Sequence, residues 1–78
     1  MMKLSPQNPN PLYYQLYTQL KHAIETGNFS PNEQLLSERQ LAARYGISRS
    51  TVRKALFQLE NDGYVQAEHG RGNFVAKK

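Results

Sequence analysis

Apolar residues recur at helical spacing along the first third of the chain. Pro11 is acceptable in the first turn of a helix, and Gly27 is a typical stop. The pattern therefore predicts a helix over residues 11–26, then a turn and a short extended piece at residues 34–36. Successive apolar residues of this helix are four positions apart: Leu12, Leu16, Leu20 and Ile24.

A second helix is predicted from about Glu38 to Tyr45. Ser37, with Gln40 three residues later, fits the capping box, in which each side chain bonds the other residue's backbone N–H. Gly46 can adopt a positive φ and so ends the helix. The residues expected to point inward are Leu41, Ala42 and Tyr45.

A third helix is predicted over residues 49–62, capped by Ser48 and ended by Gly63. Four of its apolar residues fall within an arc of about 100°. They are Val52, Ala55, Leu56 and Leu59. The roughly opposite side carries Arg49, Ser50, Arg53 and Lys54. A helix, a tight turn with glycine and a second helix form the helix-turn-helix arrangement.

The last part of the chain has the pattern of a β-hairpin. The β-prone stretches "YVQA" and "NFVA" flank "EHGRGN", which supplies two glycines and an asparagine for a mobile, basic tip. Residues expected to face the helices are Val65, Phe74, Ala67 and Ala76. The predicted fold is α+β, a winged helix-turn-helix with three helices, a short strand and a C-terminal hairpin wing.

A chain of 78 residues is a single domain. Residues 11–76 are expected to fold, preceded by a polar, proline-rich and flexible arm at residues 1–10. The absence of cysteine excludes disulfides and thiolate metal sites. No apolar run is long enough for a membrane span, and we expect a cytoplasmic protein.

The net charge of +4 points to an anionic partner because the cations are clustered. Five of them lie between positions 39 and 54 with no acid among them: Arg39, Arg44, Arg49, Arg53 and Lys54. Such a cluster creates a local field that attracts polyanions. Arg44 lies late in its helix, where a cation suits the helix dipole without any ligand.

The start of the third helix is the candidate nucleic-acid site. The planar fork of Arg49 or Arg53 can pair with guanine O6 and N7, and Ser50 and Thr51 are short donors. The alternative is a solvated basic face on an ordinary helical domain. Arg39 also leaves two alternatives, a phosphate contact or an ion pair with Glu33 or Glu38.

The predicted hairpin tip is a second basic element. Gly70 and Gly72 flank Arg71, so the backbone can approach DNA closely while Arg71 enters a narrow minor groove. His69 can donate to a phosphate. The alternative is a plain solvent-exposed turn.

Other classes of function fit less well. No arrangement of nucleophile, base and acid points to an enzyme, no histidine has metal-ligand spacing, and we expect no cofactor. The rival hypothesis is a protein-interaction module anchored by Tyr14 and Phe57. RNA binding is disfavoured because the wing has no aromatic platform for unpaired bases.

With these residues placed, the sequence resembles the DNA-binding domain of GntR-family bacterial transcription regulators. The motifs are "LLSERQLAARYGISRSTVRKALFQLENDGYV" and "HGRGNFV". The opening "PLYYQLYTQLKHAI" is most similar to the HutC-type branch, and the short YtrA-type regulators are the alternative.

The resemblance implies a homodimer that binds double-stranded DNA at an inverted-repeat operator as a repressor. It also implies a set of DNA contacts from the second helix, the third helix and the wing. These fall on Arg39, Arg49, Ser50, Thr51, Arg53, His69, Gly70 and Arg71, to which Ser48 and Lys54 are added from their positions here. The family normally continues into a domain that binds a small-molecule effector, so we expect residues 77–78 to begin the linker to that absent domain.

Overall fold

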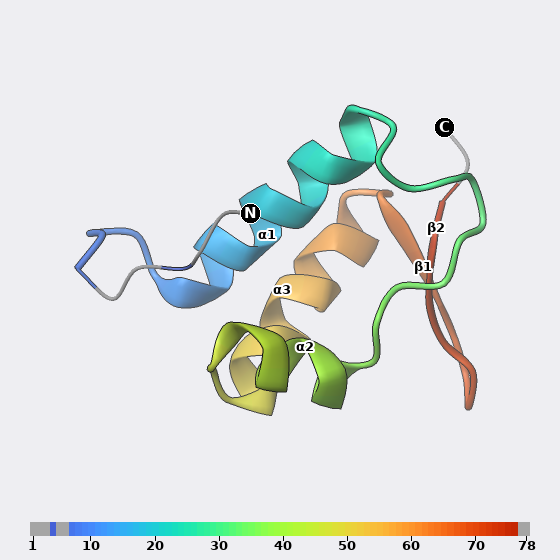
Figure 1. Ribbon diagram of the computed structural model, residues 1–78. Coiled ribbons are helices and arrows are strands. Elements are labelled where there is room, and N and C mark those ends of the chain that lie inside the picture. The colour runs from blue at the N-terminus through green and yellow to red at the C-terminus, as the bar shows by residue number, and fades with distance from the viewer. Residues whose placement is uncertain (1–3, 5–6, 77–78) are drawn as a thin grey trace.

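The computed structural model describes residues 4 and 7–76 and contains three helices and one hairpin. The helices are α1 (Leu12–Glu25), α2 (Glu38–Tyr45) and α3 (Arg49–Asn61), and the strands are β1 (Val65–Glu68) and β2 (Gly72–Val75). The helices form one layer, with the hairpin beside them, and the segment joining α1 to α2 runs along the hairpin (Figure 1). The predicted winged helix-turn-helix is confirmed.

The helix ends follow from their capping residues. The Ser37 hydroxyl accepts from the Gln40 backbone N–H, and the Gln40 side chain accepts from the Ser37 backbone N–H, so the predicted capping box is present. Gly46 ends α2 with φ of 68°, a left-handed conformation that glycine adopts without a Cβ clash. The predicted bounds of α2 are confirmed. The first and third helices each end one residue earlier than predicted, with Thr26 and Asp62 at the C-cap positions.

One face of α3 forms the centre of the core. Its four predicted apolar residues are all buried, and Leu59 and Val52 are among the largest fully buried side chains, together with Leu16 of α1. From α2 only Leu41 is fully buried, while Ala42 and Tyr45 pack at the margin of the core. The core is therefore built mainly between α1 and α3.

The segment before α2 completes the wing by backbone hydrogen bonds. The Leu35 N–H donates to the Asn73 carbonyl and the Asn32 N–H to the Val75 carbonyl, both at 2.9 Å. Gln34 and Phe74 form an isolated antiparallel bridge. The predicted extended piece is thus present as a single bridge rather than a full strand.

The inward face of β2 was predicted wrongly. Val65 lies opposite Val75, and these two are the buried residues of the hairpin. Phe74 lies opposite Gln66 and therefore on the other face, because side chains alternate along a strand. Ala67 is exposed because it lies nearer the tip, beyond the helices, while Ala76 is partly buried.

Half of the expected arm at residues 1–10 and all of the expected linker lie outside the described residues, which exclude residues 1–3, 5–6 and 77–78. Within the described part, Leu4 packs against the core and the Asn10 carbonyl accepts from the Gln15 side chain. No described helix is long and apolar enough to cross a membrane.

A polar contact between α1 and the end of α3 generates a testable pH dependence. The Tyr17 hydroxyl donates to Asp62 at 2.5 Å, and this bond raises the pKa of Tyr17 to about 12 and lowers that of Asp62. The ionised carboxylate of Asp62 stabilises the fold fully above the usual aspartate pKa of about 3.9. This stabilisation is lost as the pH falls through the lowered pKa of Asp62 in the folded protein. Stability from Tyr17 is present below pH 10 and is lost as pH rises through about 12.

We predict that Tyr17→Phe lowers the free energy of unfolding at pH 7. The difference from the parent chain should shrink below about pH 4 and above about pH 10. Urea unfolding at a series of pH values measures it, with Tyr14→Phe as the exposed control. A difference that stays constant from pH 3 to 7 would contradict the assigned contact.

Candidate nucleic-acid interface

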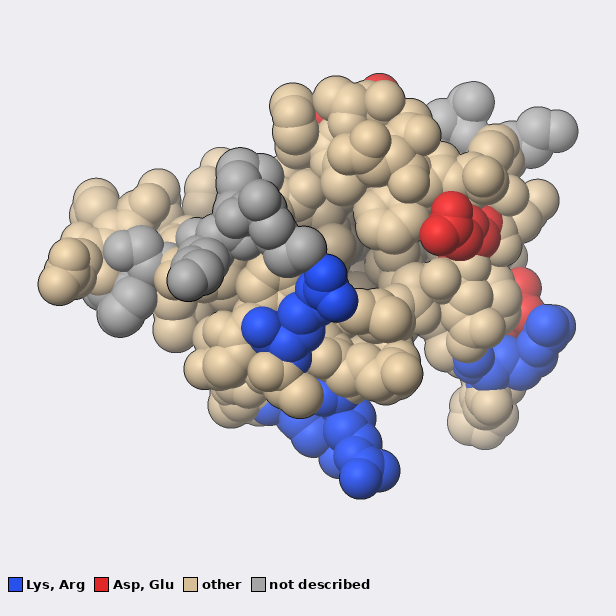
Figure 2. Space-filling model, viewed as in Figure 1, with Lys and Arg blue, Asp and Glu red and all other residues tan. Residues whose placement is uncertain are grey.

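The N-terminal half of α3 presents a polar, basic face to solvent. Arg49, Ser50, Arg53 and Lys54 are exposed, on the side opposite the buried face of the helix. Figure 2 shows basic side chains gathered along the lower edge of the molecule, over the α2–α3 end and over the hairpin. The two faces predicted for this helix are therefore confirmed.

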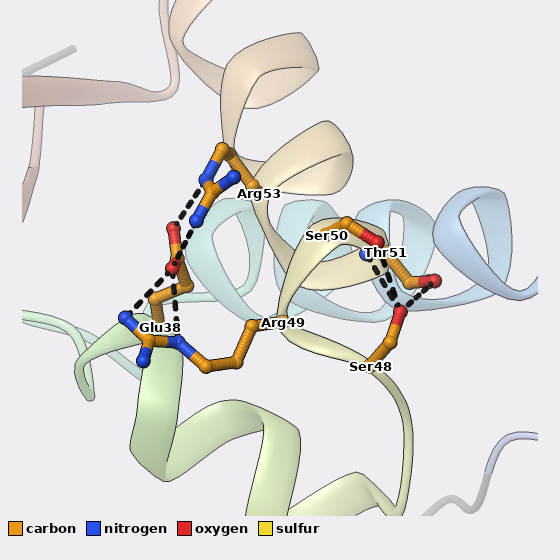
Figure 3. Close-up of polar contacts among 6 residues, drawn as sticks. All are labelled: Glu38, Ser48, Arg49, Ser50, Thr51 and Arg53. Atoms are coloured by element: carbon orange, nitrogen blue, oxygen red, sulfur yellow. Dashed lines mark hydrogen bonds and ion pairs between the residues drawn. The ribbon is translucent and has the colours of Figure 1, made fainter.

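Ser48 organises the first turn of α3. Its hydroxyl oxygen accepts from the Thr51 backbone N–H at 3.1 Å, and it also lies 2.8 Å from the Thr51 hydroxyl and 3.1 Å from the Ser50 hydroxyl (Figure 3). The first turn contains no acidic residue, so the cap and the free N–H groups leave it attractive to anions. The structure thus brings three of the predicted site residues together at one helix end.

Glu38 was considered in the sequence only as a partner of Arg39, and its pairing with the two arginines of α3 was missed. Its carboxylate accepts from Arg53 Nε at 2.9 Å and Nη2 at 2.8 Å, and from Arg49 Nε at 3.2 Å (Figure 3). Hydrogen bonding by Arg53 is the largest cause that lowers the pKa of Glu38, and the same bond raises the pKa of Arg53. The partners are 11 and 15 positions away in the sequence, across a turn, so only the packing of α2 on α3 reveals the pairing.

Arg39 does not form the ion pair considered as its alternative role. Among the described residues no acidic side chain pairs with it, because the carboxylate of Glu38 holds the two arginines of α3 and that of Glu33 accepts from the Ser30 N–H. Arg39 is exposed on α2. Arg44 lies in the last turn of α2, where its charge suits the helix dipole as predicted.

Lys54 lies apart from the two arginines, at the edge of the exposed face of α3 beside Tyr13 of α1. Its ammonium is 4.2 Å from the centre of the Tyr13 ring, a cation–π contact. The side chain remains exposed at the edge of the basic face, where its charge adds to that of the helix end.

The wing tip carries the remaining predicted residues. Arg71 pairs with Glu68 at 3.1 Å, and its guanidinium lies 5.3 Å from the centre of the Phe74 ring. The Gln34 amide donates to the Arg71 carbonyl at 2.7 Å. A Cβ on Gly72 would lie 3.0 Å from that amide nitrogen, so glycine allows this close approach. His69 and Gly70 are exposed at the tip.

Two aromatic side chains proposed as anchors of the rival hypothesis are exposed. Phe57 of α3 has 65% of its surface accessible and Tyr14 of α1 has 43%. They lie on different helices, and neither takes part in the polar contacts that organise the basic face.

The fold and the basic face define a winged helix-turn-helix DNA-binding domain. The sequence profile described as "Bacterial regulatory proteins, gntR family" matches residues 12–75, and the chain belongs to that family. It therefore carries the DNA-binding domain of a family of non-enzymatic transcription regulators.

A similar bacterial protein agrees with this assignment. The chain is 47% identical over 76 residues to the HTH-type transcriptional repressor NagR of Bacillus subtilis, covering 97% of this chain and 31% of that protein. The chain thus spans about a third of that relative's length.

Solved structures show the same fold. A protein described as a transcriptional antiterminator from Listeria monocytogenes EGD-e superposes with a TM-score of 0.93 at 29% identity, covering all of this chain and 58% of that one. The DNA-binding domain of AraR in complex with operator ORE1 superposes with a TM-score of 0.84 at 30% identity, covering 97% and 93% of the two chains.

We predict that Ser48→Ala lowers the free energy of unfolding by about 1 kcal/mol, because it removes the side-chain cap of α3. Ser50→Ala is the matched control, since its hydroxyl caps no backbone N–H in the structure, and it should change stability by less than about 0.5 kcal/mol. Urea unfolding measures both. Equal losses in the two variants would contradict the capping role.

Proposed function

We propose that this chain reads operator sequence for a bacterial transcription repressor, with α3 in the major groove and the wing in the adjacent minor groove. The observation that carries the proposal is the exposed N-terminal half of α3. It presents two arginine forks and two short hydroxyl side chains at a capped helix end, while its other face is anchored in the core. Recognition helices present their N-terminal residues to base edges in this way.

Each part of the basic face has a proposed role. Arg49 and Arg53 read bases, while Arg39, whose guanidinium has no acidic partner among the described residues, contacts phosphate. Arg71 enters the minor groove. The full set of proposed DNA contacts is Arg39, Ser48, Arg49, Ser50, Thr51, Arg53, Lys54, His69, Gly70 and Arg71.

The proposed assembly follows from the family. We place the chain in the HutC-type branch on its opening motif, and in the cytoplasm, where a bacterial regulator meets its operator. We also propose a homodimer on an inverted-repeat operator and an effector-binding domain beyond residue 78. The name of the NagR relative supports the direction of regulation.

Selection from a random duplex DNA library at moderate salt tests the proposal. We expect enrichment of one half-site, or of an inverted repeat if two copies bind together. Retention of DNA without any enriched sequence would show electrostatic binding only and would contradict sequence reading. No retention at low salt would move the assignment to the protein-interaction hypothesis, with Phe57→Ala as its first variant.

Substitutions separate base reading from phosphate binding. Arg49→Ala and Arg53→Ala should each weaken binding to the selected duplex by about 1–3 kcal/mol and relax base preference. Lys54→Ala should weaken binding to all sequences similarly and flatten the logarithmic salt dependence by about one unit. Fluorescence anisotropy over a salt series measures both effects, with Arg44→Ala as a control of equal charge. Unchanged base preference in both arginine variants would contradict direct readout.

A further inference from the structure

We propose that Glu38 is a positioning residue for base recognition. One carboxylate of α2 holds the guanidinium groups of Arg49 and Arg53 and so sets which of their edges meets the DNA. This inference rests on the proposed function and adds to the interface a residue that itself repels phosphate.

The geometry at Arg53 leaves one defined edge for a base. Its Nε and Nη2 atoms form a two-pronged contact with the two oxygens of Glu38, at 2.9 and 2.8 Å. A guanidinium has five N–H donors, so three remain, two on Nη1 and one on Nη2. The outer edge formed by Nη1 and Nη2 presents two parallel donors, which is the arrangement that guanine O6 and N7 accept.

Glu38 contacts Arg49 through the same guanidinium edge as in Arg53, the edge formed by Nε and Nη2. Its Nε lies 3.2 Å and its Nη2 3.1 Å from the same Glu38 oxygen. Arg49 and Arg53 are one helical turn apart, so without the carboxylate their like charges would repel and the two side chains would diverge. Glu38 offsets that repulsion and gives both forks a common direction.

The carboxylate is the anchored member of this group. Its side chain is only 23% exposed, whereas those of Arg49 and Arg53 are 60% and 65% exposed. The backbone at Glu38 follows directly after the capping box, whose two hydrogen bonds between Ser37 and Gln40 measure 2.9 and 3.0 Å. We call Glu38 together with Arg49 and Arg53 the clamp. Because the clamp already restricts the two arginine side chains in the free protein, they lose less conformational entropy when DNA binds.

Opposite effects on affinity and selectivity follow from this arrangement. The negative charge of Glu38 lowers affinity for every DNA sequence, because it partly neutralises two cations near the phosphates. Its hydrogen bonds raise discrimination between sequences, because they align the donors with base edges. Loss of the carboxylate should therefore strengthen binding to non-specific DNA and weaken base preference.

The test compares Glu38→Gln with Glu60→Gln in the 78-residue chain. Glu60 is exposed on α3 and forms no ion pair among the described residues, so it provides the same change of charge without removing a hydrogen bond to either arginine. Dissociation constants are measured for the duplex selected with the parent chain and for its single-base variants.

We expect Glu38→Gln to reduce the ratio of the dissociation constants for the altered and the selected duplex about five- to tenfold, within the range of one good base contact. It should also tighten binding to a scrambled duplex. Glu60→Gln should leave the ratio unchanged. In an Arg49→Ala, Arg53→Ala background, Glu38→Gln should have no further effect on the ratio, because the forks that it positions are gone.

A Glu38→Gln variant that keeps the full ratio would overturn the inference while leaving sequence reading by the chain intact. A parent chain that itself shows no preferred sequence would overturn the proposed function, and with it this inference.

A second measurement needs no variant: the Nε–H protons of Arg49 and Arg53 should exchange with water more slowly than that of Arg39 in nuclear magnetic resonance spectra. Equal exchange at all three would overturn the clamp.

Discussion

Burial of one face of α3 against α1 is the contact on which the rest of the molecule depends. A domain of about this size buries only about 60% of the surface that its unfolded chain exposes, so few residues can supply the core. Val52 and Leu59 of α3 are completely buried together with Leu16 of α1. Because a helix is a rigid rod, fixing this face also fixes the direction of the opposite one. The basic face is thus oriented by apolar packing that contains none of its own residues.

The unfavourable interaction of the Arg49 charge with the dipole of α3 is offset by neighbouring groups. A cation at a helix N-terminus opposes the helix dipole, and Arg49 is the first residue of α3. Ser48 satisfies a free N–H group there, while Glu38 of α2 places a carboxylate beside Arg49 and Arg53. The wing also places an acid beside an arginine, since Glu68 pairs with Arg71. Each of these three arginines therefore already has an acidic partner, so an anion that binds there must compete with a carboxylate of the protein.

The parts of the fold that could be predicted are those specified by local signals. Ser37, Gln40 and Gly46 mark both ends of α2 by themselves, and Ser48 marks the start of α3, because caps act through bonds within a few residues. The inward face of β2 could not be derived, since the exact pairing of the two strands decides whether Val75 or Phe74 meets the core. The Glu38 clamp was hidden for a similar reason. It depends on the angle between two helices and joins residues 11 and 15 positions apart.

The two halves of the basic face are connected through the segment that precedes α2. Its backbone bonds to β2 at three points, from Asn32 to Val75, from Leu35 to Asn73, and from the Val75 N–H back to the Glu33 carbonyl. The same segment leads within a few residues to Glu38, which holds the arginines of α3. The wing and the start of α2 are therefore joined by a short, hydrogen-bonded stretch of chain. In this small domain the spacing between the wing and α2 is set by backbone hydrogen bonds, while the direction of α3 is set by the core.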